Sequence, residues 1–131
     1  MSFSLSNLTK SKIKSLPFSR IARLILGGKF DLSVVVCGET LSRSLNRRRG
    51  KRSPTNILSF KLLPVGGSEV GEIFLNGVRI RREARLLGKA IRRHFLDLYL
   101  HGLFHLKGLR HGRKMDQAVH KFAERFDVRG V

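Results

Sequence analysis

The alternation of apolar and polar positions along the chain predicts short strands interspersed with helices. Four segments combine β-branched or aromatic residues with turn residues at their ends, which is typical of strands. They are FSLSNL at 3–8, LSVVVC at 32–37, ILSFKLLPV at 57–65 and GEIFLN at 71–76. The second segment is almost continuously apolar, which predicts a strand covered on both faces.

Helical segments lie between and after these strands. Pro17 opens a short amphipathic segment that ends at Gly27 and Gly28, in agreement with the positional preferences of proline and glycine. The other expected helices cover 39–48, 78–87, 89–106 and 115–126. Strands mixed with helices predict an α/β (α+β) fold, in which helices sandwich a small mixed sheet. A chain of 131 residues is long enough for one such domain, so we expect a single domain over 1–131.

The balance of charged residues indicates that this small domain binds an anionic partner. Lys and Arg total 27 against 9 Asp and Glu, which gives a formal net charge of +18. Such an excess predicts binding to a polyanion. No apolar run approaches the ~20 residues of a membrane span, so we expect no membrane association.

The N-terminal segment and the single cysteine indicate the cellular compartment of the protein. The first residues are basic and rich in serine, as in a transit peptide, but a strand followed by a helix is the favoured interpretation. Cys37 is the one cysteine, so it forms no internal disulfide, and its apolar surroundings predict a packed strand residue. These features favour the reducing cytoplasm.

Two clusters of cations supply most of the excess charge. Both are expected mainly to neutralise phosphates, because few carboxylates oppose them. The first comprises Arg43, Arg47, Arg48, Arg49, Lys51 and Arg52, in a loop with glycine and proline. The second comprises Arg79, Arg81, Arg82, Arg85, Lys89, Arg92 and Arg93.

The stretch HGLFHLKGLRH at 101–111 contains the candidate chemistry. His101 and His105 are four residues apart, which places both rings on one side of a helix. His111 follows Gly108, whose left-handed conformation can fold the chain back toward the first two rings. Three imidazoles with one open position are typical of a catalytic zinc site, so we predict one bound Zn²⁺. Simple packing of histidines in the core is the alternative interpretation.

Two further histidines are not expected to be ligands. Ile91, His94, Leu98, His101 and His105 share one helical stripe, which the spacing predicts to face the core. His94 lies about 10 Å along the helix axis from His101, too far for one ion. His120 has no partner in the sequence and is expected to be a surface or packing residue.

The histidine spacing also matches the metzincin motif H-E-x-x-H-x-x-G-x-x-H, apart from one position. Gly102 stands where metzincins have the glutamate that acts as general base. A protease activity is therefore not favoured, although a metzincin-like zinc site on a central helix is. Glycine within a helix is costly, and this suggests a close backbone approach at position 102.

Three segments together resemble the YbeY endoribonuclease family. HGLFHLKGLRH is similar to its signature H-G-x-L-H-L-x-G-Y-D-H. RGKRSPTNILSF at 49–60 resembles R-G-K-x-x-P-T-D-V-L-S-F, and GEIFLN resembles G-D-I-x-I. The resemblance covers the chain from about residue 31 onward. It departs from the family pattern at Leu109, Arg110 and Asn56, which replace tyrosine, aspartate and aspartate.

The resemblance implies a zinc-dependent endoribonuclease that cleaves single-stranded RNA. It implies a role in maturing ribosomal RNA near the 3′ end of the small-subunit RNA, and in ribosome quality control. His101, His105 and His111 would bind the zinc ion, and Arg49 would face the scissile phosphate. We further expect flanking phosphates to contact Arg47, Arg48, Lys51 and Arg52.

The expected partners are ribosomal RNA and the small ribosomal subunit, and the pattern specifies no oligomeric state. Two other hypotheses stay open. One is a non-catalytic, zinc-containing RNA-binding assembly factor, favoured by the charge reversal at Arg110. The other is a basic ribosomal or architectural protein without a metal.

Overall fold

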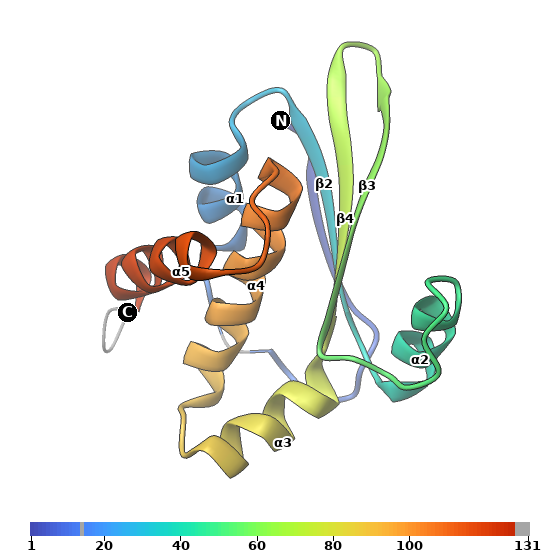
Figure 1. Ribbon diagram of the computed structural model, residues 1–131, viewed down its shortest axis with the longest axis vertical. Helices are drawn as coiled ribbons and strands as arrows, with labels where there is room; N and C mark the ends of the chain where they lie inside the picture. The colour runs from blue at the N-terminus through green and yellow to red at the C-terminus, as the bar shows by residue number, and fades with distance from the viewer. Residues whose placement is uncertain (14, 128–131) are drawn as a thin grey trace.

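The computed structural model describes residues 1–13 and 15–127, and it contains the expected mixture of strands and helices (Figure 1). The elements follow the order β1 (Phe3–Asn7), α1 (Phe18–Leu26), β2 (Phe30–Cys37), α2 (Glu39–Arg47), β3 (Ile57–Val65), β4 (Ser68–Asn76), α3 (Gly77–Leu87), α4 (Ile91–Lys107) and α5 (Arg113–Phe126). The prediction of an α/β (α+β) fold is confirmed. The largest boundary difference is β4, which begins three residues before the predicted strand because the 66–67 glycines alone form the turn.

The strands form one mixed sheet in the order β1-β2-β4-β3. β1, β2 and β4 run parallel, and β3 pairs antiparallel with β4 at one edge. The β3–β4 connection is a tight hairpin in which Gly66 and Gly67 have φ of 57° and 81°. Two consecutive positive φ values are typical of the two-residue turns whose twist matches that of paired strands.

The hydrophobic core lies between one face of this sheet and helices α1, α4 and α5 (Figure 1). Val34, Val36, Ile73 and Leu75 of the two central strands are fully buried there. Tyr99 of α4 is also fully buried, and its hydroxyl donates a hydrogen bond of 2.8 Å to the carbonyl of residue 18. α4 is therefore the central helix of the layer that covers the sheet.

The opposite face of the sheet is covered only in part. α2 lies on that side, and Leu45 of α2 and Leu58 of β3 are both buried (Figure 1). Along β2, however, Ser33 and Val35 alternate with fully buried neighbours and are only half-buried. The prediction of a strand covered on both faces is therefore wrong for the middle of β2, where none of the described helices covers the outer face.

None of the helices in the described ranges is both long enough and apolar enough to span a lipid bilayer.

Candidate active site

The three predicted histidines and Arg49 lie around one small cleft. The cleft has a volume of about 70 Å³, between α4, the beginning of β3 and the turn that follows α4. Its lining residues are Arg49, Ile57, Ser59, His101, Gly102, His105 and His111. Residues from three parts of the sequence thus meet at one place, as the histidine spacing and the resemblance predict.

α4 presents His101 and His105 at the border of its buried face rather than at the centre. His101 is half-buried and His105 is exposed. The fully buried stripe of the helix contains Leu96, Leu100 and Leu103, which have the same spacing of three and four residues. The prediction that the histidine stripe faces the core is therefore wrong for His105, whereas His94 of the same stripe is buried. Because α4 is apolar around most of its circumference, periodicity alone does not tell which stripe faces inward.

A sharp change of direction after α4 brings the third histidine back toward the first two. Gly108 ends the helix with φ of 109°, a left-handed conformation that glycine adopts without strain. The ring of His111 then has its centroid 6.3 Å from that of His101 and 6.2 Å from that of His105. The predicted return of the chain at Gly108 is confirmed, and the three rings lie beside the same cleft.

Burial and neighbouring positive charge favour the neutral form of His101 and His105. Loss of hydration lowers the pKa of His101 below its usual value of 6.5, and the charge of His111 lowers it further. The pKa of His105 is also lowered, first by burial and then by His111 and Arg49. Neutral imidazole is the form that donates a lone pair to a metal ion.

The donor set fits zinc chemically, although the rings do not form a closed cluster. Among the described residues, no group of three His, Cys, Asp or Glu side chains has the geometry of a metal-binding cluster. Nδ1 of His101 lies 3.3 Å from the sulfur of Met115, which leaves Nε2 as the available ring nitrogen. Three imidazoles at a partly open cleft are ligands that zinc accepts, with one position left for another group.

Gly102 is required by the packing of α4 on the sheet. A Cβ atom at this position would lie 2.8 Å from Cδ1 of Ile57 and 3.1 Å from Cδ1 of Ile73. The expected close approach at position 102 is confirmed, and it comes from two strands. A glutamate side chain here would point into β3 and β4 rather than into solvent at the cleft, so the metzincin general base has no place in this fold.

Buried polar residues of α2 fix the loop that contains Arg49. Asn46 donates a hydrogen bond of 2.7 Å from Nδ2 to the carbonyl of Ser53. The hydroxyl of Ser42 donates to the carbonyl of Thr55 at 2.8 Å and accepts from its N–H at 3.0 Å. The end of the loop that leads into β3 is thus held against α2, so Arg49 has a defined place beside the histidines.

The expected phosphate-binding residues Arg47, at the end of α2, and Arg48, Lys51 and Arg52, in this loop, are all exposed. In the part of the chain that the structure describes, none of them forms an ion pair with a carboxylate. Their positive charge is thus available to an external anion, and their contact with RNA stays a prediction.

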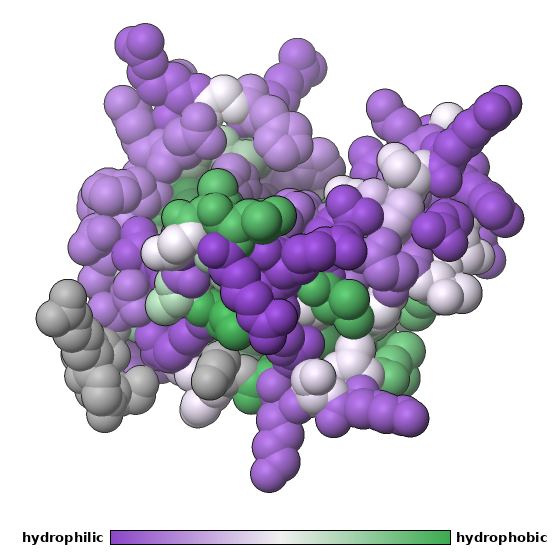
Figure 2. Space-filling model, turned by 90° about the horizontal axis from the view of Figure 1, so that it is seen from below, coloured by the Kyte–Doolittle hydropathy of each residue, from purple (hydrophilic) through white to green (hydrophobic). Residues whose placement is uncertain are grey.

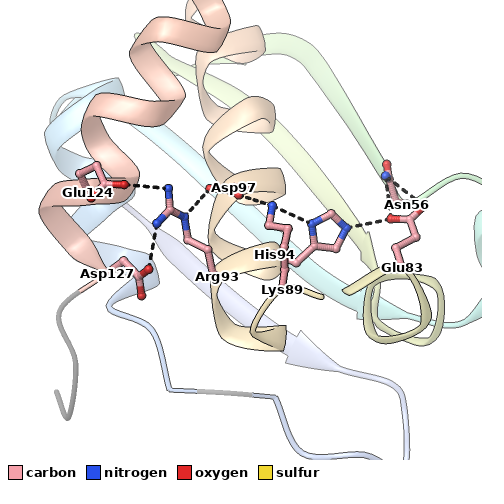
Figure 3. Close-up of polar contacts among 8 residues, drawn as sticks. All are labelled: Asn56, Glu83, Lys89, Arg93, His94, Asp97, Glu124 and Asp127. Atoms are coloured by element: carbon pink, nitrogen blue, oxygen red, sulfur yellow. Dashed lines mark hydrogen bonds and ion pairs between the residues drawn. The ribbon is translucent and has the colours of Figure 1, made fainter. Parts of the chain in front are cut away.

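His94 belongs to a separate polar network on the side of α4 that faces α3 (Figure 3). Its Nε2 lies 2.9 Å from Oε1 of Glu83, and its Nδ1 lies 3.4 Å from Nζ of Lys89. Lys89 in turn donates to Asp97 at 2.5 Å. With both ring nitrogens engaged, His94 is a buried structural residue, as its distance from His101 predicts. His120 is exposed and does not line the cleft.

Most of the second basic cluster is neutralised within the protein. Arg79 and Arg82 form ion pairs with Glu39 at 3.1 and 3.2 Å, and these hydrogen bonds and charges lower the pKa of that carboxyl despite its partial burial. Three further carboxylates form ion pairs with members of this cluster. Asp97 pairs with Lys89 and Arg93, Asp127 pairs with Arg92 and Arg93, and Glu124 pairs with Arg93. The prediction that phosphate binding explains this cluster is therefore wrong for these residues. Hydrophilic side chains still dominate the face seen from below (Figure 2).

Ser59 and Ile57 line the cleft but were not singled out from the sequence. They are two residues apart on β3, so both side chains project toward α4. The alternation of this strand could have indicated Ser59, because the hydroxyl shares a face with residues expected to contact the long helix.

Comparisons with known proteins identify a family whose members resemble this chain. The model of the family described as Endoribonuclease YbeY matches residues 4–126. Endoribonuclease YbeY of Petrotoga mobilis is 28% identical over 120 residues, which cover 90% of this chain and 82% of that protein. The Azoarcus sp. and Methylocella silvestris proteins of the same name are 34% and 35% identical, over 86% and 76% of this chain. This chain spans about half the length of those two relatives, 48% and 58%.

A solved structure has the same fold. The solution structure of TM1509 from Thermotoga maritima superposes with a TM-score of 0.62 and 21% identity. The superposition covers 95% of this chain and 88% of that one.

Proposed function

Because the chain belongs to the YbeY family, we propose that it is an endoribonuclease, a hydrolase that cleaves phosphodiester bonds within RNA. The observation that supports this function most directly is the convergence of Arg49 with His101, His105 and His111 at one cleft. A cation and three nitrogen donors at a single cleft are suited to phosphoryl chemistry.

The proposed metal is one zinc ion, with His101, His105 and His111 as its ligands. A zinc ion bound there would supply Lewis acidity that activates water for attack near neutral pH. The protein would contribute the orientation of the rings. Nδ1 of His101 faces the sulfur of Met115 and the turn at Gly108 returns His111 to the same cleft, so the three rings would close on the ion from one place.

Arg49 has the proposed role of stabilising the phosphodiester during cleavage. Its planar guanidinium can donate two hydrogen bonds to phosphate oxygens, where negative charge increases as the bond is attacked. The buried amide of Asn46 holds the loop and thereby keeps this side chain at the cleft. Four exposed cations at the end of α2 and in the same loop would bind the flanking phosphates: Arg47, Arg48, Lys51 and Arg52.

The proposed substrate is single-stranded ribosomal RNA near the 3′ end of the small-subunit RNA. The net charge of +18 supports a highly anionic partner. Association with the small ribosomal subunit, a part in ribosome quality control and a cytoplasmic location belong to the same proposal.

The test compares purified wild-type protein with His105→Ala and Arg49→Ala, and with His120→Ala as a matched control outside the cleft. We expect His105→Ala to lose bound zinc, measured by elemental analysis, together with cleavage of a precursor RNA that contains the small-subunit 3′ end. Arg49→Ala should keep the metal and lose cleavage, and His120→Ala should resemble the wild type. Undiminished zinc and cleavage in His105→Ala would refute the assignment.

A second candidate is a zinc-containing RNA-binding assembly factor that does not cleave RNA. The observation that favours it is the composition of the cleft, because no Asp or Glu is among its described lining residues. A carboxylate is a common general base, and none is positioned there. Protein that contains zinc and binds the precursor RNA, but leaves it intact, would select this candidate.

A further inference from the structure

We propose that the turn between α4 and α5 is a second RNA-binding flank of the cleft, in which Arg110, Arg113 and Lys114 bind backbone phosphates of single-stranded RNA. This inference rests on the proposed function, because it concerns RNA that also contacts the histidine cleft. It adds a contact surface to the arginine-rich loop between α2 and β3.

The first observation is which Lys and Arg side chains form ion pairs with carboxylates of the protein itself. Ion pairs with carboxylates occupy five members of the second basic cluster, namely Arg79, Arg82, Lys89, Arg92 and Arg93. Most of these pairs connect α2 to α3 or α4 to the end of α5, so they contribute to the fold. Arg110, Arg113 and Lys114 form no ion pair with any carboxylate in the described ranges, and all three are exposed.

The second observation is that these three cations adjoin the cleft directly. His111 lines the cleft together with Arg49, and it also lines a shallow hollow of about 530 Å³ along the α4–α5 turn. That hollow is lined by residues 108–114 alone, which include all three cations. A strand of RNA that passes the three imidazoles can therefore continue over this turn without leaving the protein surface.

Helix stability does not explain two of these charges. Arg113 and Lys114 are the first residues of α5, and the first turn of a helix carries a partial positive charge that disfavours cations. The only acidic residue of that turn is Asp116. Cations placed against the helix dipole, exposed and without an internal partner, are better explained by an external anion.

The chemistry of the turn indicates which part of RNA it binds. Residues 108–114 contain no Phe, Tyr or Trp, so the turn has no large aromatic side chain on which unpaired bases could stack. Arginine and lysine remain, and they bind phosphate oxygens irrespective of the base. The turn should therefore increase affinity and its dependence on salt without choosing a sequence.

The test uses the full chain with three neutral substitutions, R110Q/R113Q/K114Q. The matched control is R20Q/R23Q/K29Q, which removes the same charge from exposed cations of α1 and the segment after it. Binding of a fluorescein-labelled single-stranded RNA of about 16 nucleotides is measured by anisotropy between about 50 and about 300 mM KCl. Each phosphate contact contributes about 0.7 to the slope of log K against log salt.

We expect the turn variant to lose about 2 from this slope and to bind about tenfold or more weakly at low salt, whereas the control changes little. Equal losses in the two variants would overturn the inference, because diffuse charge would then explain binding. If thermal unfolding shows that the triple variant is not folded, Arg110→Gln against Arg20→Gln decides the question with an expected slope change of about 0.7.

The outcomes separate this inference from the proposed function. Wild-type protein that cleaves RNA, with a turn variant that binds like the control, refutes the inference and leaves the function standing. Wild-type protein that binds but never cleaves refutes the function, and the slopes still decide whether the turn contacts RNA.

Discussion

Gly102→Ala is the substitution for which the structure gives the most specific prediction. The added Cβ would lie 2.8 Å from Cδ1 of Ile57 and 3.1 Å from Cδ1 of Ile73. Both distances are shorter than ordinary van der Waals contact, so at least one isoleucine must move. Ile73 is fully buried on a central strand, whereas Ile57 is half-buried at the beginning of the edge strand β3. The movement should therefore occur at Ile57, which lines the cleft.

Two opposing effects determine the size of the change. Alanine is favoured over glycine within a helix by about 1 kcal/mol. An extra methyl group in a well-packed core costs about 1–3 kcal/mol. We therefore expect Gly102→Ala to lower the free energy of unfolding by about 1 kcal/mol, since Ile57 can yield only in part. For 131 residues, this corresponds to a decrease in Tm of about 4 °C.

A double-mutant cycle with Ile57→Val tests the cause, because this change removes the Cδ1 atom that the new methyl group would meet. Urea unfolding is measured for the wild type, both single variants and the double variant. Ile57→Val alone should cost about 0.5–1.5 kcal/mol, and the double variant should be more stable than the sum of the two losses by about 1 kcal/mol. Additive losses, or a stabilised Gly102→Ala, would show that α4 does not pack against β3 in this way.

The remaining predictions concern titratable groups. Burial, aided by the charge of Glu39, raises the pKa of the Cys37 thiol to about 11. A thiol reagent at about pH 8 should therefore modify the native protein far more slowly than the urea-unfolded chain. Equal rates of modification would contradict the burial of β2. Because the pKa values of His101 and His105 are lowered in the folded state, the unfolded chain takes up more protons as the pH falls through 6.5. Their contribution to stability is therefore present above that pH and lost below it, so Tm should decrease between about pH 7.5 and about pH 5.5, and less steeply in His101→Gln.

Local spacing predicted more of this protein than long-range pairing did. The interval between His101 and His105 and the position of Gly108 predicted the meeting of the three rings, because both depend on helix geometry within eleven residues. The partners of the second basic cluster could not be predicted in this way. Glu39 pairs with Arg79 across forty residues, and the order of strands in the sheet determines which elements meet.

The orientation of α4 about its own axis also could not be predicted from the spacing of its apolar residues. Its leucines and its histidines have the same period, and only the surface of the sheet selects between them. The packing partners of Gly102 are isoleucines of β3 and β4, neither of which is close in sequence. The glycine could be noticed in the sequence, whereas its neighbours required the tertiary structure.

The hydrogen bonds from Ser42 and Asn46 have a consequence for how RNA is engaged. A long arginine-rich connection would ordinarily lose conformational entropy at the moment of association, which weakens binding. Here the backbone around Arg49 has already lost that freedom when the chain folds. Preorganisation of this kind leaves only side-chain rotamers to be restricted when a nucleic acid strand arrives, so more of the electrostatic attraction remains as affinity.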